Sequence, residues 1–192
     1  MRTKENLMRA FAGESQARNR YDIAAEYCKK QGYHVLYDVF RYTAEQEKEH
    51  AKIFYDFLKD MDGQTIYIDG GYPVNNNDDI VKLLEDASHN EFEERNVIYP
   101  EFAKIAREEG FPKIAYAFEE ISKIEETHAI RFEYYIDLIK NNELFDGDEN
   151  STWHCTKCGY HHRGKTAPKE CPVCHHEQGY FTHYEPHLVK KH

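Results

Sequence analysis

The stretch Arg41–Phe54, RYTAEQEKEHAKIF, puts a glutamate and a histidine in the middle of an otherwise apolar helix face. Alternating steps of four and three residues define that face, which is the spacing of a helix seam turned toward a bundle core. Its members are Leu36, Phe40, Thr43, Glu47, His50, Phe54, Phe57 and Met61. Solvated charges would lie on the outer face, so the pattern predicts that Glu47 and His50 are buried in a helical bundle.

The same polar break recurs on the other predicted helices. A seam running from Ile114 to Ile139 is interrupted by a second Glu-x-x-His pair. The helix before it carries two glutamates on its inner face, and the first helix carries one glutamate followed two turns later by a tyrosine. These residues are Glu125, His128, Glu91, Glu94, Glu14 and Tyr21. The chain therefore reads as an internal repeat, in which a Glu-bearing helix precedes a Glu-x-x-His helix.

Residues typical of helix ends divide positions 3–141 into four helices of roughly 28–32 residues each. Glycines suited to C-terminal caps follow three periodic stretches, at Gly32, Gly63 (after Met61) and Gly110. Asn77 or Asp78 can cap the third helix, and Pro112 suits the first turn of the fourth.

The connections between these helices predict the topology. The first and third connections are only a few residues long, so each joins an antiparallel hairpin. The middle one, residues 62–77, could span about 50 Å if extended, enough to run the length of the bundle. The sequence therefore predicts an all-α four-helix bundle with one long crossover, the ferritin-like arrangement.

The negative charge of the seam glutamates indicates that they bind metal ions. Five seam glutamates would bring five negative charges into one core, and an isolated buried carboxylate costs several kcal/mol. Two iron ions, ferrous or ferric, would nearly neutralise the cluster, and carboxylate with imidazole suits iron or manganese. Di-iron bundles use one Glu from each of two helices and Glu-x-x-His from each of the others. The predicted ligands are Glu14, Glu47, His50, Glu91, Glu94, Glu125 and His128, one glutamate more than that set requires.

Four of the five cysteines form a second predicted metal site. They are spaced as two Cys-x2-Cys knuckles, Cys155/Cys158 and Cys171/Cys174, a tetrahedral set for zinc or iron. A rival set that combines Cys171 and Cys174 with His183 and His187 is disfavoured, because it strands the other two cysteines. We predict a bundle over 1–142, a polar linker over 143–151 and a metal-binding module over 152–192, which is too small to fold on apolar burial alone.

The bulk composition narrows the function. A formal net charge of -10 argues against nucleic-acid partners, no apolar run is long enough to span a membrane, and no signal peptide is evident. These features predict a cytoplasmic protein without membrane or nucleic-acid contacts. Residues outside the two sites are expected to be uninvolved, with Cys28 a quiet helix thiol and the remaining histidines on the surface; these are His34, His89, His154, His161, His162, His175, His176 and His183.

Several motifs together resemble the rubrerythrin family. AGESQARNRY (12–21), EKEH (47–50), NEFEERNVIYPEFAKIAREEGF (90–111) and EETHAIRF (125–132) are similar to its di-iron domain, and CTKCGY and CPVC to its rubredoxin-like tail. The resemblance covers nearly the whole chain, and it implies that the C-terminal module is a small rubredoxin-like domain of strands and loops holding one Fe(SCys)4 centre.

The resemblance also implies roles for individual residues. Glu47 and Glu125 would bridge two irons, Glu14 and Glu91 would be terminal ligands, and His128 would bind one iron. Glu94 in the oxidised state and His50 in the reduced state would exchange on the other. Tyr21 and Tyr99 would hydrogen-bond ligating carboxylates, and Cys155, Cys158, Cys171 and Cys174 would hold the tail iron. Glu94, His50, Tyr21 and Tyr99 are thus the expected catalytic residues.

The reaction implied is reduction of hydrogen peroxide to water in oxidative stress defence. Electrons would come through the tail from a separate NAD(P)H-linked reductase or a rubredoxin, because nothing in the chain resembles a dinucleotide-binding fingerprint. A head-to-tail or domain-swapped homodimer would bring one chain's tail to the other chain's di-iron site. The alternatives are a ferroxidase or iron-handling protein of the ferritin-like class, and an interaction scaffold with a zinc ribbon.

Overall fold

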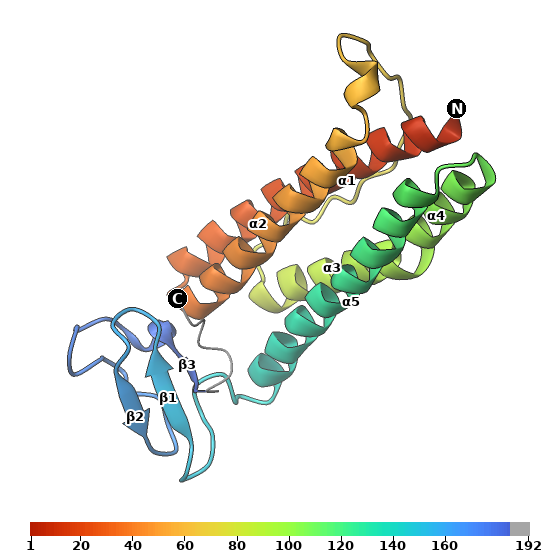
Figure 1. Cartoon of the computed structure of the whole chain (residues 1–192). Helices are drawn as coiled ribbons and strands as arrows, with labels where there is room; N and C mark the ends of the chain where they lie inside the picture. The colour runs from red at the N-terminus through yellow and green to blue at the C-terminus, as the bar shows by residue number, and fades with distance from the viewer. Residues whose placement is uncertain (185–192) are drawn as a thin grey trace.

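A four-helix bundle and a small sheet make up the chain in the computed structural model, which describes residues 1–184 (Figure 1). One antiparallel hairpin pairs α1 with α2. The other pairs α5 with a long rod made of α3, a π-helical segment η2 and α4. The bounds are α1 Arg2–Lys30, α2 His34–Asp56, α3 Ile80–Glu93, η2 Glu94–Ile98, α4 Tyr99–Glu108 and α5 Pro112–Lys140. None of these helices is long and apolar enough to span a membrane.

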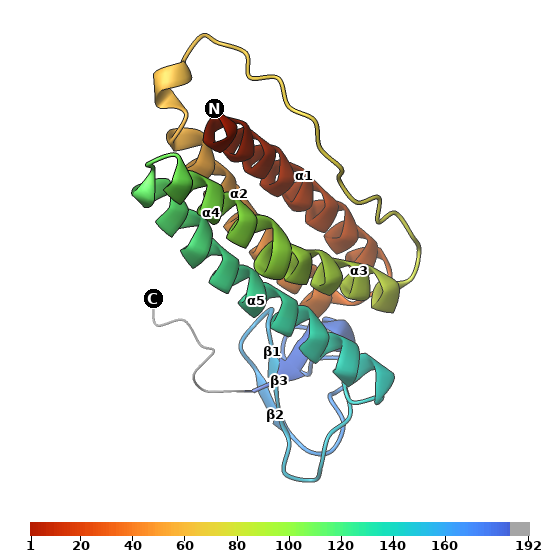
Figure 2. The same cartoon turned by 90° about the vertical axis from the view of Figure 1, so that its right-hand side faces the viewer.

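The crossover between the hairpins confirms the predicted ferritin-like topology. It leaves the end of α2 through a short 3-10 turn, η1 (Lys59–Met61), and runs along α1 to the start of α3 at the opposite end of the bundle (Figure 2). This path requires a long connection, which the sixteen residues 62–77 supply.

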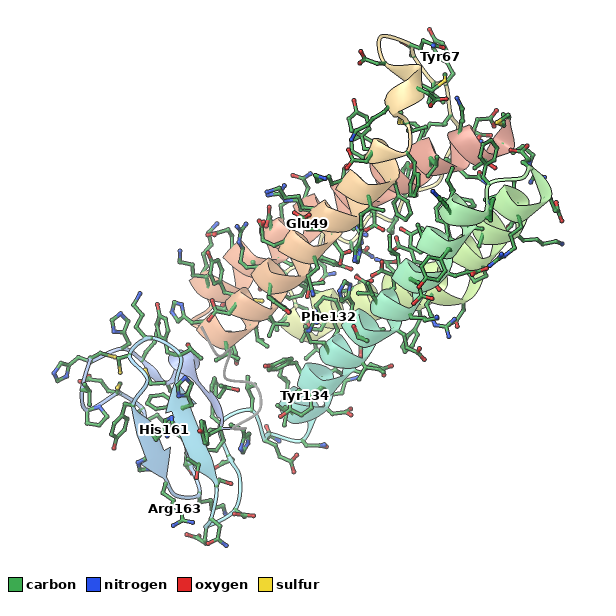
Figure 3. The ribbon with its side chains drawn as sticks, in the orientation of Figure 1. Glu49, Tyr67, Phe132, Tyr134, His161 and Arg163 are labelled. Atoms are coloured by element: carbon green, nitrogen blue, oxygen red, sulfur yellow. The ribbon has the colours of Figure 1, made fainter. Side chains whose placement is uncertain are left out.

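Two buried clusters of apolar side chains fill the bundle on either side of its centre. One gathers around Phe40, Leu84 and Phe132, and the other around Phe54 and Phe118. Figure 3 shows Phe132 pointing between the helices and Glu49 pointing outward from α2. The polar seam residues lie between the two clusters along the chain, so apolar packing on both sides fixes the helices that carry them.

Most predicted helix ends are confirmed. Gly32 and Gly110 adopt φ values of +80° and +85° just beyond α1 and α4, and Pro112 opens α5. The cap of α3 is Asp79 rather than Asn77 or Asp78, because the Asp79 carboxylate accepts a hydrogen bond from the backbone N–H of Lys82 at 2.8 Å.

Two helices depart from the predicted continuous rods. The second ends at Asp56 instead of near Met61, because the chain there tightens into i→i+3 hydrogen bonds, such as Met61 N–H to Leu58 O at 2.8 Å. The third is interrupted at Glu94–Ile98 by one π-helical turn. Single π turns inside α-helices occur frequently at functional sites.

The tail forms a three-stranded antiparallel sheet in the order β2-β1-β3, with β1 Thr152–Cys155, β2 His161–Arg163 and β3 Phe181–His183, and a 3-10 turn η3 (Gln178–Tyr180) before β3. Trp153 and Phe181 are fully buried at its centre. The predicted linker packs onto this unit: Leu144 is buried, and Phe145 accepts a hydrogen bond from the Ala167 N–H at 2.9 Å. Residues 185–192, including His187 of the rival ligand set, lie outside the described chain.

The tail is docked on the end of its own bundle, beside the start of α2 (Figure 1). His34 was expected on the surface, but its side chain is only 12% exposed, because its Nε2 contacts Glu177 at 2.8 Å and its ring stacks on Tyr180 at 3.8 Å between centroids. Beside it, the backbone of Gly179 comes so close that a Cβ there would lie 1.7 Å from the carbonyl oxygen of Gly32. The tail is therefore packed on the bundle, not merely tethered to it.

Gly179→Ala should weaken this docking by about 1–3 kcal/mol, because the added methyl group has no room against the backbone of Gly32. Hydrogen exchange in the first turn of α2 and proteolysis within residues 143–151 should both accelerate. Gly71→Ala is the matched control, since a Cβ at that position meets no atom within 4 Å. Equal exchange and cleavage in both variants would show that this contact does not hold the tail.

Candidate metal centres

The predicted polar seam residues meet at the centre of the bundle. Every helical rod contributes: α1 one glutamate, α2 and α5 a Glu-x-x-His pair each, and α3 one glutamate. All six are almost fully buried, namely Glu14, Glu47, His50, Glu91, Glu125 and His128. Because residues three apart on a helix share a face, each Glu-x-x-His pair points both of its side chains inward.

These six residues form two overlapping groups that share Glu47 and Glu125. Glu14 and His50 complete one group, and Glu91 and His128 complete the other. Within each group one donor atom per residue lies within 4.8 Å of all the others. Two cation positions with two glutamates in common are the geometry of a dinuclear site with bridging carboxylates.

Unsatisfied polar atoms show that the cluster fits metal ions. Seven buried donor or acceptor atoms lack an aligned hydrogen-bond partner here: Glu14 Oε2, Glu47 Oε1, Glu91 Oε2, both carboxylate oxygens of Glu125 and both ring nitrogens of His128. Several are nevertheless close, for example His128 Nδ1 at 2.8 Å from Glu125 Oε2. Buried polar atoms are rarely left unpaired, so these atoms point to cations as their partners.

The metal-free cluster holds protons in place of cations. Burial raises the pKa of Glu91 to about 8, helped by the charge of Glu47, and it raises the pKa of Glu14 well above its usual value, with Glu125 the next largest cause. Burial alone would lower the pKa of His50, but contacts with Glu125 and Glu47 outweigh it and raise it to about 9. The same competition raises the pKa of His128 to about 12.

Glu125 shows the opposite shift. Burial would raise its pKa, but the two histidines beside it, His128 first and His50 next, lower it to about 2. The cluster therefore contains an ionised carboxylate between two imidazolium groups. Metal ions would take over the role of these positive charges.

Two tyrosines link the ligand-bearing helices reciprocally. Tyr21 on α1 donates a hydrogen bond to Glu91 on α3, and Tyr99 on α4 donates one to Glu14 on α1. Both tyrosines are buried. Each thus orients one outer glutamate and satisfies one of its oxygens, as the resemblance implied.

Glu94 stands apart from both groups, although it lies beside them. It opens the π-helical turn η2 and is only half-buried. Burial first, then the charges of Glu91 and Glu125, raise its pKa well above the usual value. In this structure His50, and not Glu94, completes the group that contains Glu14.

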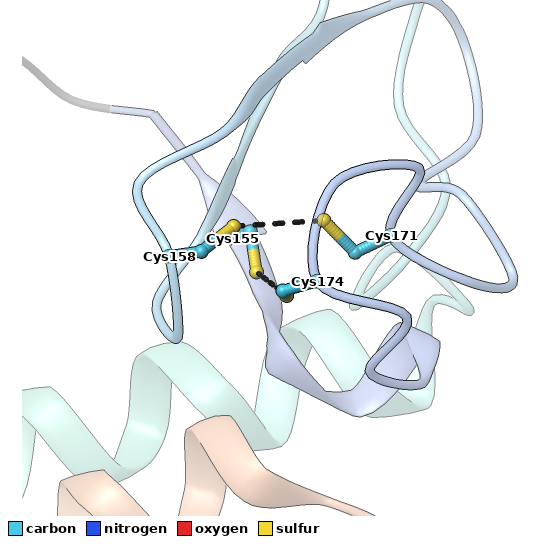
Figure 4. Close-up of side chains that lie close together, drawn as sticks. All are labelled: Cys155, Cys158, Cys171 and Cys174. Carbon is cyan, nitrogen blue, oxygen red and sulfur yellow. Dashed lines mark hydrogen bonds between the residues drawn. The ribbon is translucent and has the colours of Figure 1, made fainter.

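The four tail cysteines converge on a second centre (Figure 4). Cys155 Sγ lies 3.8 Å from Cys174 Sγ, and Cys158 Sγ lies 3.6 Å from Cys171 Sγ. A tetrahedral ion with metal–sulfur bonds of about 2.3 Å has edges of roughly 3.8 Å, so the distances fit. Burial would raise the pKa of Cys171, but the backbone N–H groups of Cys174 and Val173 lower it to about 7, which favours the thiolate that binds metal.

The histidines and the cysteine predicted to take no part in the metal sites differ in their exposure. His89, His161 and His175 are exposed as expected, and Cys28 is buried away from both centres. Four tail histidines are half-buried instead of exposed, because they pack within the sheet and its loops; these are His154, His162, His176 and His183.

Arg131 was not singled out by the sequence analysis. Its guanidinium donates to Thr43 at 2.8 Å, close enough to the cluster for the charges of Glu91 and Glu47 to act on it. Its position one turn after His128 was the available signal.

Comparisons with known proteins agree with this two-centre architecture. The family model described as Rubrerythrin matches residues 5–75 and 82–156, and the one described as its rubredoxin-like domain matches residues 153–182. Rubrerythrin-1 of Clostridium acetobutylicum is 46% identical over 182 residues, 94% of this chain and 93% of the relative. Rubrerythrin of Nitratidesulfovibrio vulgaris is 41% identical over 180 residues, 94% and 93%.

Two solved structures share the fold, one over nearly the whole chain and one over the bundle. Fully reduced nigerythrin is 28% identical, with a TM-score of 0.64 over 95% of this chain and 86% of that one. A Desulfovibrio desulfuricans bacterioferritin, 24% identical with a TM-score of 0.65 over 74% and 82%, shares the bundle fold.

Loading the metal-free protein with ferrous ions at pH 7 should release at least two protons, because Glu91, with a pKa of about 8, and His50, with a pKa of about 9, must both lose theirs to bind metal. Anaerobic calorimetry in buffers of different ionisation enthalpy counts them. Glu49→Gln, on the outer face of α2 (Figure 3), is the control that should behave as wild type, whereas Glu47→Gln should bind more weakly.

The same shifts set a pH dependence of stability. Between pH 4.5 and about 8 the folded metal-free chain keeps a proton on Glu91 that the unfolded chain loses, so the free energy of unfolding should fall as pH rises. The raised pKa of His50 makes the free energy of unfolding fall further between pH 6.5 and about 9. Glu125 adds stability above pH 4.5 that is lost only toward pH 2. Denaturant unfolding that is more resistant at pH 8 than at pH 5 would contradict the assignment.

Proposed function

The chain belongs to the rubrerythrin family, and we propose that it reduces hydrogen peroxide to water at its ferritin-like di-iron site. The observation that carries this proposal is the presence of two different metal centres in one chain. One is the paired carboxylate–histidine group built on Glu47 and Glu125, and the other is the four-cysteine site. Storage of iron needs no built-in electron supply, whereas repeated reduction of peroxide does.

The chemistry needs two electrons and two protons for each peroxide. When bound, the two irons supply the electrons that break the O–O bond, and two waters result. Glu47 and Glu125 would hold both metal positions together, since each belongs to both groups. Tyr99 and Tyr21 keep Glu14 and Glu91 turned toward the metals through their hydroxyl hydrogen bonds.

Glu94 and His50 would alternate as ligands of one iron. A buried site that loses positive charge on reduction is better matched by neutral imidazole, and one that gains it by a carboxylate. The placement of His50 inside the group, with Glu94 just outside it on a π-helical turn, supports this exchange. Single π turns inside α-helices are frequent at functional sites, which agrees with a functional role for Glu94.

The electron supply would run through the tail. We propose residues 1–142 as the catalytic unit, 152–192 as the Fe(SCys)4 relay and 143–151 as the link between them. A separate NAD(P)H-linked reductase or a rubredoxin would reduce the relay. Thiolate ligands need a reducing setting, so a cytoplasmic location is part of the proposal.

The path from tail to di-iron site would cross between two chains. The tail packs against His34, and the stretch of α2 from His34 to Glu47 is about 20 Å long at 1.5 Å per residue. A chain's own tail therefore lies at one end of the bundle, about 20 Å along α2 from the cluster at its centre. A head-to-tail or domain-swapped homodimer would bring the partner's tail closer.

Glu94→Ala should slow peroxide turnover by about tenfold or more, as expected when a ligand or acid–base group is lost. The visible absorbance of the tail should be unchanged. Turnover is measured as peroxide consumption with an excess of reductant, and the tail absorbance is read from a visible spectrum. Glu49→Ala is the control. Full turnover in Glu94→Ala would remove the exchanging-ligand role. Iron uptake far beyond the capacity of the two centres would favour the ferroxidase and storage alternative.

Electron transfer from the tail of one chain to the di-iron site of the other can be tested by complementation between two inactive variants. Glu94→Ala leaves the tail intact, and Cys171→Ser leaves the bundle cluster intact, so each homodimer lacks one half of the route. Co-expressed chains should regain turnover well above either variant alone, because one mixed orientation combines a working tail with a working bundle. Mixed dimers as inactive as the parents would show that each tail serves its own bundle.

A further inference from the structure

A cavity of about 240 Å³ lies between α1, the crossover and the η2–α4 segment. Two of the residues that line it, Glu94 and Tyr99, connect it to the di-iron cluster: Glu94 lies beside the cluster, and Tyr99 donates its hydroxyl to Glu14. Its volume is several times the roughly 30 Å³ of one water in the liquid. Four further cavities of the described chain are lined by none of the candidate ligands.

The crossover segment covers this cavity. Tyr72 lies among its lining residues, and its hydroxyl donates to the backbone oxygen of Arg9 at 3.2 Å. The guanidinium of Arg9 in turn donates to Asp69 twice, to the backbone oxygen at 3.0 Å and to Oδ1 at 2.7 Å. These contacts tie the middle of the crossover, Asp69 to Tyr72, to α1 beside the cavity.

Asn75, further along the crossover, makes contacts with two helices. The side-chain oxygen of Asn75 accepts from Arg20 on α1 and from Asn90 on α3, both at 2.7 Å. The stretch from Asp69 to Asn75 includes Gly70, Gly71, Tyr72 and Pro73, which all line the cavity. A connection that needed only to span the bundle would not require these contacts, so the structure holds this short stretch in one place as a roof.

On α1, Gly13 leaves the cavity open. Glycine inside a helix costs about 1 kcal/mol relative to alanine, and Gly13 sits near the middle of α1 with a φ that gives no conformational reason for it. A Cβ at this position would meet Tyr72 at 3.8 Å, which is ordinary contact. Any larger side chain would project into the space under Tyr72.

The lining favours a small, uncharged, polar molecule. Two lining glutamates, Glu93 and Glu101, outnumber the one lining cation, Arg9, which disfavours anions. Val97 and Phe102 make part of the wall apolar. Hydrogen peroxide is uncharged and little larger than water, whereas organic hydroperoxides carry a bulky apolar group.

We propose that this cavity is the entrance by which peroxide reaches the di-iron site from the Glu94 side, and that Tyr72 and Gly13 limit its size. The inference rests on the proposed peroxidase function for its substrate, but the route itself can be tested without turnover. It makes Tyr72 a specificity-determining residue that touches neither metal position.

The first experiment narrows the entrance. Gly13→Leu fills the space below Tyr72, and leucine is a better helix former than glycine, so α1 itself is not weakened. Nitric oxide, a small uncharged probe, is mixed anaerobically with the ferrous protein, and its binding is followed by stopped-flow absorbance. Binding and hydrogen peroxide turnover should both slow by about tenfold or more. The control Tyr67→Ala alters an 88% exposed tyrosine of the same crossover, seen at its outer turn in Figure 3, and should match wild type.

The second experiment widens the entrance. Tyr72→Ala should raise kcat/KM for cumene hydroperoxide relative to hydrogen peroxide by about tenfold, while Tyr72→Phe, which keeps the ring, should not. If Gly13→Leu does not fold, Tyr72→Ala alone tests whether the cavity is the entrance.

The outcomes separate the two proposals. An unchanged nitric oxide rate in folded, iron-loaded Gly13→Leu, or an unchanged substrate ratio in Tyr72→Ala, overturns the entrance. A wild-type protein that binds nitric oxide but consumes no peroxide overturns the proposed function, and the slowing by Gly13→Leu then still tests the route.

Discussion

The burial of carboxylates and imidazoles at the bundle centre is the constraint on which the rest of the structure depends. Glu14, Glu47, Glu91 and Glu125 are almost completely removed from water, with His50 and His128 buried among them. Uncompensated, such a cluster would cost several kcal/mol for each charge. In the metal-free chain, bound protons reduce the buried charge, and in the loaded protein the metal ions balance it. Binding of metal and stability of the bundle are therefore coupled.

The helices are arranged to serve that cluster. Two hairpins bring four ligand-bearing faces together, and the reciprocal bonds of Tyr21 and Tyr99 tie α1 to the α3–α4 rod through the ligands themselves. Apolar clusters around Phe40 and Phe54 fill the core on either side. The α-helical hydrogen bonding of the α3–α4 rod is interrupted at one place, the π-helical turn that begins at Glu94. The residue proposed to move is thus the one whose backbone is least regular.

The tail is stabilised in a different way from the bundle. Its core around Trp153 is too small to stabilise it alone, so four thiolates and one metal ion replace the missing apolar burial. Its close contact with Gly32 and His34 fixes its orientation on the bundle. That contact places its cysteine site far from its own cluster, which is why a second chain enters the proposed electron route.

The sequence by itself determined the four-helix bundle, the six seam residues that meet at its centre and the four-cysteine set, because helical periodicity and Cys-x2-Cys spacing are local properties. Tertiary structure alone decided that His50 rather than Glu94 completes its group in this structure, and that His34 is covered by the tail. It also decided the π turn and the cavity under Tyr72. Each of these depends on contacts between segments far apart in the chain, such as Gly179 with Gly32 or Gly13 with Tyr72, and such contacts leave no periodic pattern along the sequence.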